Sequence, residues 1–228
     1  MPDQVFRIGQ YEIYKIVTGG RWQENCYIVK HVITQETVII DPGEDAGTIK
    51  KILYTLCCKI NGILLTHAHH DHIGAAEEIS QVFSACCYLQ KDDKRLLRQA
   101  PFYAMRFAGR EIAMPRNVLF YDNVEPIHIS GCRITAILTP GHTPGSVCYS
   151  FGQFIFTGDT LLFENVGRTD LPGGSTEEIV CSINKLLTTT DSNAVVFPGH
   201  GKAWSVKKAQ KWWEKAQGKP TEYNRFEM

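Results

Sequence analysis

The sequence predicts an α/β fold of alternating strands and helices, and three observations support this. Short apolar runs such as Thr37 to Ile40 and Ile60 to Leu65 are bounded by turn-forming residues, as buried strands are. Stretches with apolar residues three and four apart, such as Ala46 to Cys58, separate these runs and indicate helices. Of the 228 residues, 43% are apolar, which is enough for a substantial core. We therefore expect one layered domain over residues 1–228.

Most of the predicted alternation of strands and helices lies in the first half of the chain. Strands are expected at Tyr11 to Val17, Asn25 to Lys30 and Thr37 to Ile40, the last of them closed by the turn Asp41-Pro42-Gly43. A helix, a strand, a helix and a short strand then follow in order at Ala46 to Cys58, Ile60 to Leu65, Ala75 to Phe83 and Cys86 to Leu89. This β-α-β-α-β succession is typical of layered α/β chains.

The second half predicts consecutive antiparallel strands and then helices. Short apolar runs separated by glycine and proline lie at Ile127 to Ile129, Cys132 to Leu138, Ser146 to Phe151 and Phe154 to Thr157. A helix is expected at Thr176 to Leu187, with Thr176 as a possible cap, and a last strand at Ala194 to Phe197. The tail from Lys202 to Met228 is expected to be helical over Val206 to Gln217.

The stretch from Gln90 to Pro115 differs from its surroundings. It predicts a helix at Asp92 to Gln99, which is followed by a segment rich in aromatic and methionine side chains. Six basic residues against three acidic ones give it a net charge of +3. One interpretation, which we favour, is a solvated helix whose aromatic side packs on the core. The other is a lid or a docking surface for an acidic partner or an apolar substrate tail.

Composition excludes several classes of function. Lys plus Arg equals Asp plus Glu at 24 each, so no global field favours nucleic acid or membrane binding. The N-terminus lacks the basic flank and apolar core of a signal peptide, and no apolar run approaches the ~20 residues of a membrane span, so a cytoplasmic protein is expected. The eight cysteines contain no C-x-x-C pair, and we interpret them as buried free thiols rather than as a redox switch at the vicinal pairs Cys57-Cys58 or Cys86-Cys87.

The segment Thr66 to His72 places four histidines and one aspartate in six positions, between a predicted buried strand and a predicted helix. Each imidazole or carboxylate brought near a core needs a partner, and a metal ion is the economical one. In an extended segment His67 and His69 point to the same side, whereas Asp71 and His72 fall where the chain turns into the helix. The arrangement suggests two metal positions side by side.

Three later strands share a local design with the one before this segment, because each ends in a potential ligand. The four sequences are Leu64-Leu65-Thr66-His67, Ile137-Leu138-Thr139-Pro140-Gly141-His142, Phe156-Thr157-Gly158-Asp159 and Val195-Val196-Phe197-Pro198-Gly199-His200. Glycine precedes the ligand in three of them and lets the backbone approach closely, and strand ends in a layered sheet lie along one edge. The predicted ligand set is His67, His69, Asp71, His72, His142, Asp159 and His200.

Seven nitrogen and oxygen ligands without a thiolate suit Zn²⁺, Fe or Mn²⁺ and exceed what one tetrahedral ion needs. Two divalent ions that share one carboxylate, most simply zinc, fit this number better. Two such ions roughly 3.5 to 4 Å apart lower the pKa of a shared water towards ~7 and present hydroxide to a carbonyl carbon. We expect Asp71 to orient that nucleophile. We interpret His70, His31 and His128 as residues that bind no metal.

These motifs resemble those of the metallo-β-lactamase superfamily, and within it the glyoxalase II-like hydrolases. The resemblance covers about residues 11–201 and includes Gly158-Asp159-Thr160-Leu161-Leu162-Phe163 and the run from Gly167 to Gly174. It implies a four-layer αβ/βα sandwich with a binuclear site at one edge of the two sheets. It also implies that one ion is held by His67, His69 and His142, the other by Asp71, His72 and His200, with Asp159 bridging.

The resemblance narrows the reaction to hydrolysis of a thioester, whose thiolate leaves readily. Only 27 residues follow Gly201, which is too few for the helical domain that binds glutathione in glyoxalase II enzymes. The segment Arg98 to Tyr103 is more similar to the small hydrolases found with polyketide synthases, which are thought to act on acyl carrier proteins. The expected partner is therefore a small-molecule thioester or an acidic acyl carrier protein. The net +3 stretch and the lysine-rich tail are candidate docking surfaces.

Three alternatives remain open. A persulfide dioxygenase has a related motif set but uses one iron, held by the counterparts of His67, His142 and Asp159. A lactonase or RNA-processing hydrolase shares the fold, although the neutral net charge argues against strong phosphate binding. A non-catalytic metal-binding or interaction module is the alternative from a different class, and the intact set of seven ligands argues against it. For Arg168, an ion pair with Asp170 is a simpler interpretation than a contact with substrate.

Overall fold

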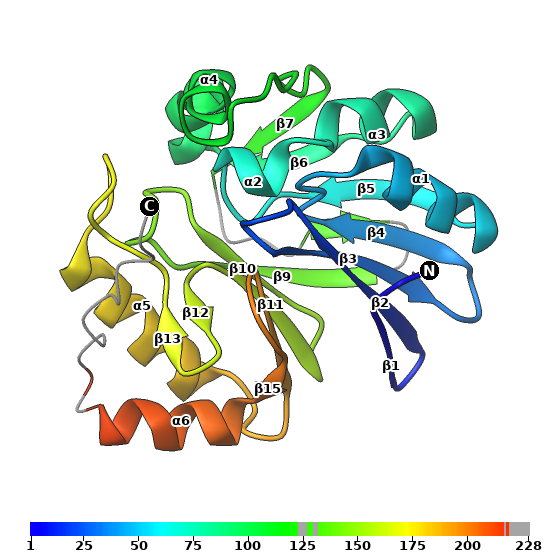
Figure 1. The fold of residues 1–228 in the computed structure, drawn as a ribbon. Coiled ribbons are helices and arrows are strands. Elements are labelled where there is room, and N and C mark those ends of the chain that lie inside the picture. Colours follow the sequence, from blue (N-terminus) through cyan, green and yellow to red (C-terminus); the bar gives the residue numbers. More distant parts are fainter. Residues whose placement is uncertain (123–126, 130–131, 217, 219–228) are drawn as a thin grey trace.

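The chain folds into two mixed β-sheets packed face to face, with helices on both outer faces (Figure 1). The computed structural model describes residues 1–122, 127–129, 132–216 and 218, without the side chains of residues 127–129, 132 and 133. Its order of layers is helix, sheet, sheet, helix, so the predicted αβ/βα sandwich is confirmed.

The first sheet has seven strands in the order β1-β2-β3-β4-β5-β6-β7. Antiparallel pairing joins β1 to β4, and parallel pairing joins β4 to β7. The strands span Gln4–Ile8, Tyr11–Thr18, Glu24–His31, Glu36–Ile40, Lys59–Leu64, Cys87–Gln90 and Val118–Tyr121. Its outer face is covered by α1 (Ala46–Thr55), α3 (Ala76–Phe83) and α4 (Lys94–Tyr103), while the one-turn helix α2 (His70–Ile73) lies at the edge.

The second sheet has six strands in the order β15-β14-β11-β10-β9-β8. These strands are Trp204–Ser205, Val195–Pro198, Phe154–Gly158, Val147–Ser150, Cys132–Leu138 and Ile127–Ile129. Two helices, α5 (Thr176–Thr189) and α6 (Val206–Lys215), cover its outer face (Figure 1). A small hairpin of β12 (Leu161–Leu162) and β13 (Asn165–Val166) follows β11.

Three apolar clusters hold the four layers together, because alternate residues of each strand face opposite sides of its sheet. Phe154 and Phe156 of β11 belong to the cluster between the sheets, whereas Ile155 faces α5 and α6. In β4, Ile40 likewise faces the second sheet and Ile39 faces the outer helices. These central strands are therefore apolar on both faces, because one face packs against the other sheet and the opposite face packs against helices.

Several sequence predictions need correction. Helix α4 does not end at Gln99 but continues through Pro101 and is followed by the π-turn Ala104–Ala108. Pro101 lies at the eighth of ten residues, where the missing N–H costs one hydrogen bond that packing of Leu97 and Ala100 offsets. The strands β1, β7, β12, β13 and β15 were not predicted. They are short, and β1 and β7 contain no fully buried residue.

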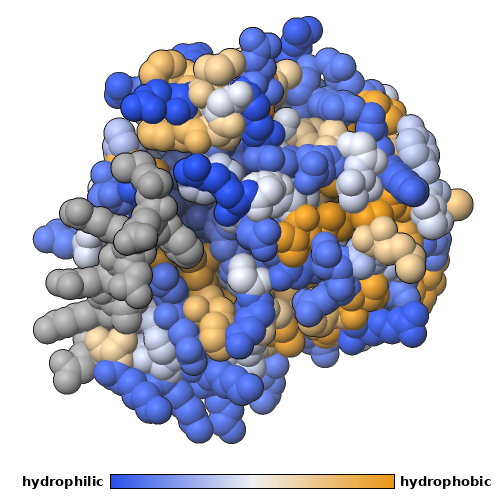
Figure 2. Space-filling view, viewed as in Figure 1, coloured by the Kyte–Doolittle hydropathy of each residue, from blue (hydrophilic) through white to orange (hydrophobic). Residues whose placement is uncertain are grey.

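The aromatic segment at the end of α4 and in the following turn does not pack on the core as expected. Phe102, Met105 and Phe107 are exposed by 67%, 48% and 43%. Figure 2 shows pale-orange atoms gathered over α4 and the following turn, bordered by hydrophilic residues and separate from a larger orange area nearer the middle of the view. The favoured packing interpretation is therefore wrong for these side chains, and a lid or docking role stays a prediction.

Two further expectations concern cysteines and membranes. All described cysteines are free, and Cys26, Cys87 and Cys148 are buried, but Cys57 and Cys181 are exposed. No described helix has the length and apolar character that a membrane crossing requires.

Candidate metal centre

The strands that precede the predicted ligands end at neighbouring edges of the two sheets. In the first sheet β4 and β5 are parallel, so Asp41 and the segment from Thr66 follow adjacent strand ends. In the second sheet β9 is antiparallel to β10, β10 is antiparallel to β11, and β11 is parallel to β14. The strands β9, β11 and β14 thus run in one direction, and the residues after them meet at one edge.

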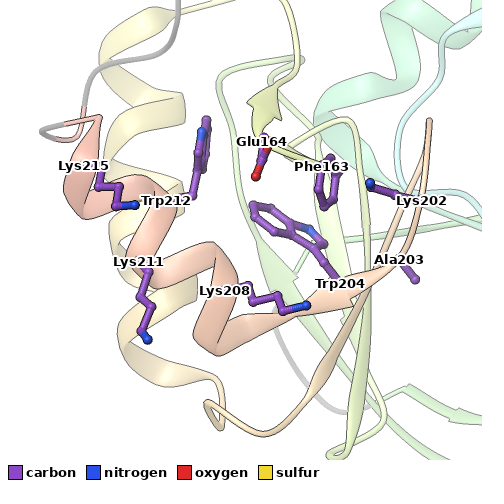
Figure 3. Close-up of a pocket in the computed structure, with 9 residues that line it drawn as sticks. All are labelled: Phe163, Glu164, Lys202, Ala203, Trp204, Lys208, Lys211, Trp212 and Lys215. Carbon is purple, nitrogen blue, oxygen red and sulfur yellow. The ribbon is translucent and has the colours of Figure 1, made fainter.

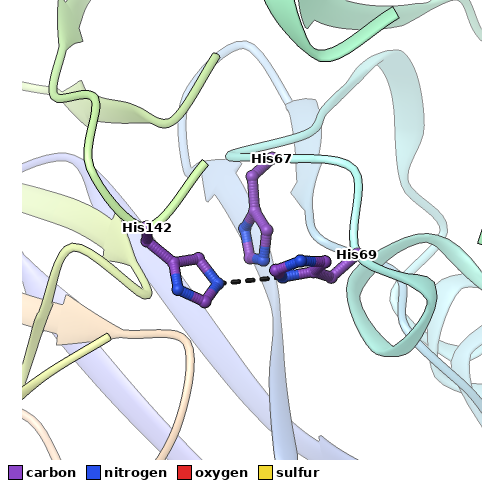
Figure 4. Close-up of side chains that lie close together, drawn as sticks. All are labelled: His67, His69 and His142. Carbon is purple, nitrogen blue, oxygen red and sulfur yellow. Dashed lines mark hydrogen bonds between the residues drawn. The ribbon is translucent and has the colours of Figure 1, made fainter. Parts of the chain in front are cut away.

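One cluster, which we call the triple-histidine group, consists of His67, His69 and His142. The potential ligand atoms of the three side chains lie within 4.8 Å of one another. His69 Nδ1 is 2.9 Å from His142 Nε2, and the ring centroids of His67 and His142 are 4.8 Å apart. Figure 4 shows the three imidazoles converging from two separate segments of the chain.

A second cluster, the Asp-His-His group, consists of Asp71, His72 and His200, again with ligand atoms within 4.8 Å of one another. His72 Nε2 is 3.2 Å from His200 Nε2, which in turn is 3.6 Å from Asp71 Oδ2. Two ligands bound at about 2.0 to 2.1 Å to one tetrahedral zinc lie roughly 3.3 Å apart. The observed separations are close to that value.

Asp159 lies between the two groups. Its Oδ2 atom is 3.6 Å from His142 Nε2 of the triple-histidine group and 3.5 Å from His200 Nε2 of the Asp-His-His group. Its Oδ1 atom is 3.5 Å from His72 Nε2. The structure therefore brings all seven predicted ligands together at one place.

The ring nitrogens that face away from the groups have partners, which fixes the imidazole orientations. His142 Nδ1 donates to the Arg168 carbonyl at 2.7 Å and His200 Nδ1 to the Trp22 carbonyl at 2.9 Å. His72 Nδ1 is 3.0 Å from Asp41 Oδ2. In contrast His67 Nε2, which would face an ion, is buried without a hydrogen-bond partner, and Asp159 Oδ1 is buried with only the 3.5 Å contact to His72 Nε2. Such orphaned buried atoms cost free energy unless something binds them, so the residues fit a bound metal.

Burial and charge act differently on the two groups. Burial, reinforced by the neighbouring histidines, lowers the pKa of His69 to about 3 and that of His67 well below its ordinary value. Burial also opposes a charge on His72, but Asp159 and Asp71 outweigh it and raise the pKa of His72 to about 10. Burial alone would raise the pKa of Asp71, yet His72 and His200 hold it well below its ordinary value. The triple-histidine group thus presents neutral imidazoles, while the Asp-His-His group is a cluster of opposite charges.

Two buried aspartates that support the site were not predicted. Asp41 lies close to His67 and His72, but both of its oxygens are used: Oδ1 accepts from the Thr66 backbone N–H at 2.7 Å, and Oδ2 bonds to Thr66 Oγ1 and His72. It therefore orients His72 and is not needed as a ligand. In the sequence, Asp41 is the first residue of an Asp-Pro-Gly turn, which already explains an aspartate at this position.

Asp93 is the second supporting aspartate and is fully buried. Its Oδ2 atom accepts hydrogen bonds from the Ala68 backbone N–H and from Thr143 Oγ1, both at 2.9 Å, and Oδ1 accepts one from the Gly145 N–H at 2.8 Å. Asp93 thereby ties the segment of His67 and His69 to the loop of His142. No local sequence signal could have revealed these contacts, since all three partners are distant in the chain.

The loop that carries His200 is held by β3. Asn25 Nδ2 donates to the carbonyls of Pro198 at 2.9 Å and Gly201 at 3.0 Å, and the Asn25 N–H donates to the Gly199 carbonyl at 2.7 Å. A Cβ atom on Gly199 would lie 2.4 Å from Asp159 Oδ1, so only glycine fits there. The glycine before His200 is thus required by close approach, as the sequence suggested.

The remaining histidines lie outside both groups. His70 is buried with its ring edge-on to Trp22, and its Nδ1 atom has no partner. His31 is hydrogen-bonded to Gln10 and Thr34 at the surface. The side chain of His128 lies outside the described residues. Arg168 forms the predicted ion pair with Asp170, with two contacts of 2.7 Å.

Comparison with known proteins identifies a matching family model and similar curated relatives. Residues 19–200 match the family model described as the metallo-beta-lactamase superfamily. A curated relative from Bacillus subtilis (strain 168), "Probable polyketide biosynthesis zinc-dependent hydrolase PksB", is 30% identical over 191 residues, which cover 83% of this chain and 79% of the relative.

Two solved structures are similar over most of their length. The BLEG-1 B3 metallo-beta-lactamase superposes with a TM-score of 0.81 at 33% identity and covers 87% of this chain and 96% of its own. TTHA1623 in a di-iron-bound form has a TM-score of 0.77 at 30% identity, with coverages of 87% and 97%.

Proposed function

The chain belongs to the metallo-beta-lactamase superfamily, and from this premise we propose that it is a binuclear zinc hydrolase that cleaves thioesters. The family match and the zinc-dependent relative identify it as a metal-dependent hydrolase. The number of ions, their identity as zinc and the thioester are our proposal. One observation carries it: Asp159 lies within 3.5 to 3.6 Å of nitrogen atoms from both groups, as a carboxylate shared by two ions would.

The seven ligands of this chain would hold the two ions in the manner that the sequence implies. His67, His69 and His142 would bind one ion, Asp71, His72 and His200 the other, and Asp159 both. When bound, such ions lower the pKa of a water molecule and polarise a carbonyl oxygen. No serine or cysteine nucleophile is then required.

The protein groups prepare the site for this chemistry. Asp71 is held in its ionised form and can accept a hydrogen bond from the attacking water, which orients it. Burial of His67, His72 and His142 excludes bulk water and strengthens every electrostatic interaction inside. The carbonyls of Trp22 and Arg168 keep Nε2 of His200 and His142 turned into the site.

A thioester is the substrate class that fits best. Its thiolate is a good leaving group, so departure needs no general acid, and we assign none of the seven ligands to that role. The relative PksB is named as a probable zinc-dependent hydrolase of polyketide biosynthesis. Acyl groups in such biosynthesis are carried as thioesters. We transfer this substrate class to the present chain as part of the proposal.

The test compares four substrates with protein loaded with zinc: an acyl-S-pantetheine, an acyl-S-glutathione, the oxygen ester of the same acyl group, and a β-lactam. The β-lactam is included because BLEG-1 is a β-lactamase. We expect a thioester to be cleaved with the highest kcat/KM. Hydrolysis of the β-lactam alone, or oxygen consumption on a persulfide by a protein with one iron, would refute the proposal.

A matched pair of variants separates the site from the rest of the surface. His67→Ala removes a buried ligand, whereas His31→Ala removes a histidine that makes only surface contacts. We expect the first to abolish turnover and the second to retain it within about twofold, as surface substitutions away from a site usually do. Equal loss in both variants would argue for a general effect on folding.

A further inference from the structure

A second cavity lies apart from the seven ligands, between the β12–β13 hairpin, β15 and α6 (Figure 3). Its volume is about 550 Å³, within the roughly 300 to 1,000 Å³ typical of small-molecule sites. The residues that line it are Phe163, Glu164, Lys202, Ala203, Trp204, Lys208, Lys211, Trp212 and Lys215. Aromatic rings and ammonium groups therefore dominate the lining.

The aromatic part of the cavity contains an unsatisfied donor. The Trp204 ring lies between Phe163 and Trp212, with centroid distances of 5.2 and 5.9 Å (Figure 3). Trp204 is only 6% exposed, and its Nε1 atom has no hydrogen-bond partner. A buried indole N–H usually finds an acceptor, and leaving it without one costs about 1 to 3 kcal/mol. Because this N–H is enclosed by protein atoms, the part of the cavity wall that Phe163, Trp204 and Trp212 form is aromatic.

The cationic part consists of four lysines that lack acidic partners within the described residues. Lys208, Lys211 and Lys215 lie on α6 at spacings of three and four, so they share one side of the helix. The Lys202 ammonium lies 4.0 Å from the centre of the Phe163 ring. Glu164 is the one carboxylate in the lining, which leaves a net charge of +3. This net positive charge attracts an anion.

The cavity lies within reach of the metal centre. Lys202 and Trp204 follow His200 by two and four residues, so their Cα atoms are at most about 7 and 14 Å from that of His200. The hairpin that carries Phe163 begins two residues after Asp159. This part of the cavity lining is therefore within a short extended arm of the metal centre.

We propose that this cavity binds the phosphate of a phosphopantetheine thioester while the thioester itself occupies the metal centre. The inference rests on the proposed function. A pantetheine arm contains three linked segments, each at least as long as one extended residue, so it spans about 10 Å or more. The lysines bind the phosphate as point charges. The arm packs on the rings of Phe163 and Trp212.

The same chemistry is present in coenzyme A and in the prosthetic group of an acyl carrier protein, whereas glutathione lacks the phosphate. The binding test uses coenzyme A itself, which has no thioester to cleave, with calorimetry and tryptophan fluorescence as readouts. We expect coenzyme A to bind at least tenfold more tightly than pantetheine, and binding to weaken as salt is raised. Equal affinity for the two compounds, or no binding of either, would overturn the inference.

Charge reversal on α6 localises the site. Lys208→Glu with Lys211→Glu is expected to weaken coenzyme A binding at least tenfold. The matched control Lys207→Glu changes an exposed lysine of the same helix that does not line the cavity and is expected to stay within threefold. All three lysines are exposed, so folding should be retained, which circular dichroism verifies. An equal effect of the control and the double variant would contradict the assignment.

Two comparisons identify the source of the phosphate and separate this inference from the proposed function. Competition by a holo carrier protein but not by its apo form would support a carrier-borne group, and binding of coenzyme A alone would support the free cofactor. Hydrolysis of acyl-pantetheine without any binding of coenzyme A would overturn the cavity assignment and leave the thioesterase proposal intact. Binding of coenzyme A without cleavage of any thioester would overturn the thioesterase proposal and leave the cavity assignment intact.

Discussion

The triple-histidine group and the Asp-His-His group lie side by side, but the protein prepares them by different means. The first contains only imidazoles, and burial keeps them neutral. The second contains one carboxylate and two imidazoles whose opposite charges stabilise each other. Neutral imidazoles can bind an ion at once, whereas protonated ones must first release a proton.

The two supporting aspartates, Asp41 and Asp93, also act on the two groups by different contacts. Asp41 contacts a ligand side chain of the Asp-His-His group directly, through His72 Nδ1. Asp93 touches no ligand side chain and instead holds the backbone on both sides of the triple-histidine group, through Ala68 and Gly145. The Asp-His-His group is therefore supported through the side chain of a metal ligand, His72, whereas the triple-histidine group is supported through the backbone of the loops that carry its histidines. Five changes test that distinction, in order of decreasing effect.

Asp159→Ala should have the largest effect, because this carboxylate serves both groups. Loss of several kcal/mol of stabilisation predicts that kcat/KM falls about a thousand-fold or more. Elemental analysis should show that both ions bind more weakly. If only one ion were lost and turnover persisted, Asp159 would belong to one group alone.

Asp41→Asn should weaken the Asp-His-His group more than the triple-histidine group, because Asp41 contacts His72 directly but reaches His67 only through the Thr66 hydroxyl. The amide can no longer accept hydrogen bonds on both sides from Thr66 and His72. Loss of such a supporting carboxylate typically lowers metal affinity about 10- to 100-fold. A chelator titration should therefore separate into one strongly weakened ion and one less affected ion. Equal weakening of both would contradict the difference between the groups.

Asp93→Asn should act mainly on stability. Its amide retains one acceptor oxygen for three donors, so at least one buried donor loses its partner, at a cost of about 2 kcal/mol in the free energy of unfolding. Urea unfolding measures this loss. The control is Asp92→Asn at the exposed neighbouring aspartate, which should change stability by less than about 0.5 kcal/mol.

The pH dependence of the Asp93 contribution gives a smaller effect. Burial, opposed by hydrogen bonds from Gly145 and Ala68, raises the pKa of Asp93 from 3.8 to about 6. The folded state then holds a proton that the unfolded state has lost, so this stabilisation is complete below about pH 4 and is lost as pH rises through 6. In metal-free protein, the stability difference between wild type and Asp93→Asn should be about 1 kcal/mol larger at pH 5 than at pH 7. A difference independent of pH would show that this carboxyl is ionised throughout.

Arg168→Ala should have the smallest effect. Its side chain pairs with Asp170 at the surface, with 47% and 65% of the two side chains exposed. Exposed ion pairs contribute about 0 to 1 kcal/mol, and His142 is held by the backbone carbonyl that the substitution retains. Turnover should stay within about threefold. A large loss of kcat would instead indicate that Arg168 contacts the substrate.

The sequence predicts those parts of this site that depend on local pattern. Apolar runs followed by glycine and histidine correctly locate His142 and His200 at strand ends, because close approach leaves no room for a Cβ at Gly199. The supporting aspartates could not be predicted, since their partners are 25 to 52 residues away in the chain. The course of α4 through Pro101 was also missed, because packing of Leu97 and Ala100 overrides the local preference to end a helix there. The cavity beside Trp204 depends on how α6 packs, which periodicity alone does not give.

The metal content of wild type and of His200→Ala tests the central claim most directly. Both proteins are loaded with excess zinc, desalted and analysed by mass spectrometry for metal per chain. We expect two ions in the wild type and one in the variant, because the triple-histidine group remains complete without His200. A single ion in the wild type that is unaffected by the His200→Ala substitution would contradict a binuclear site.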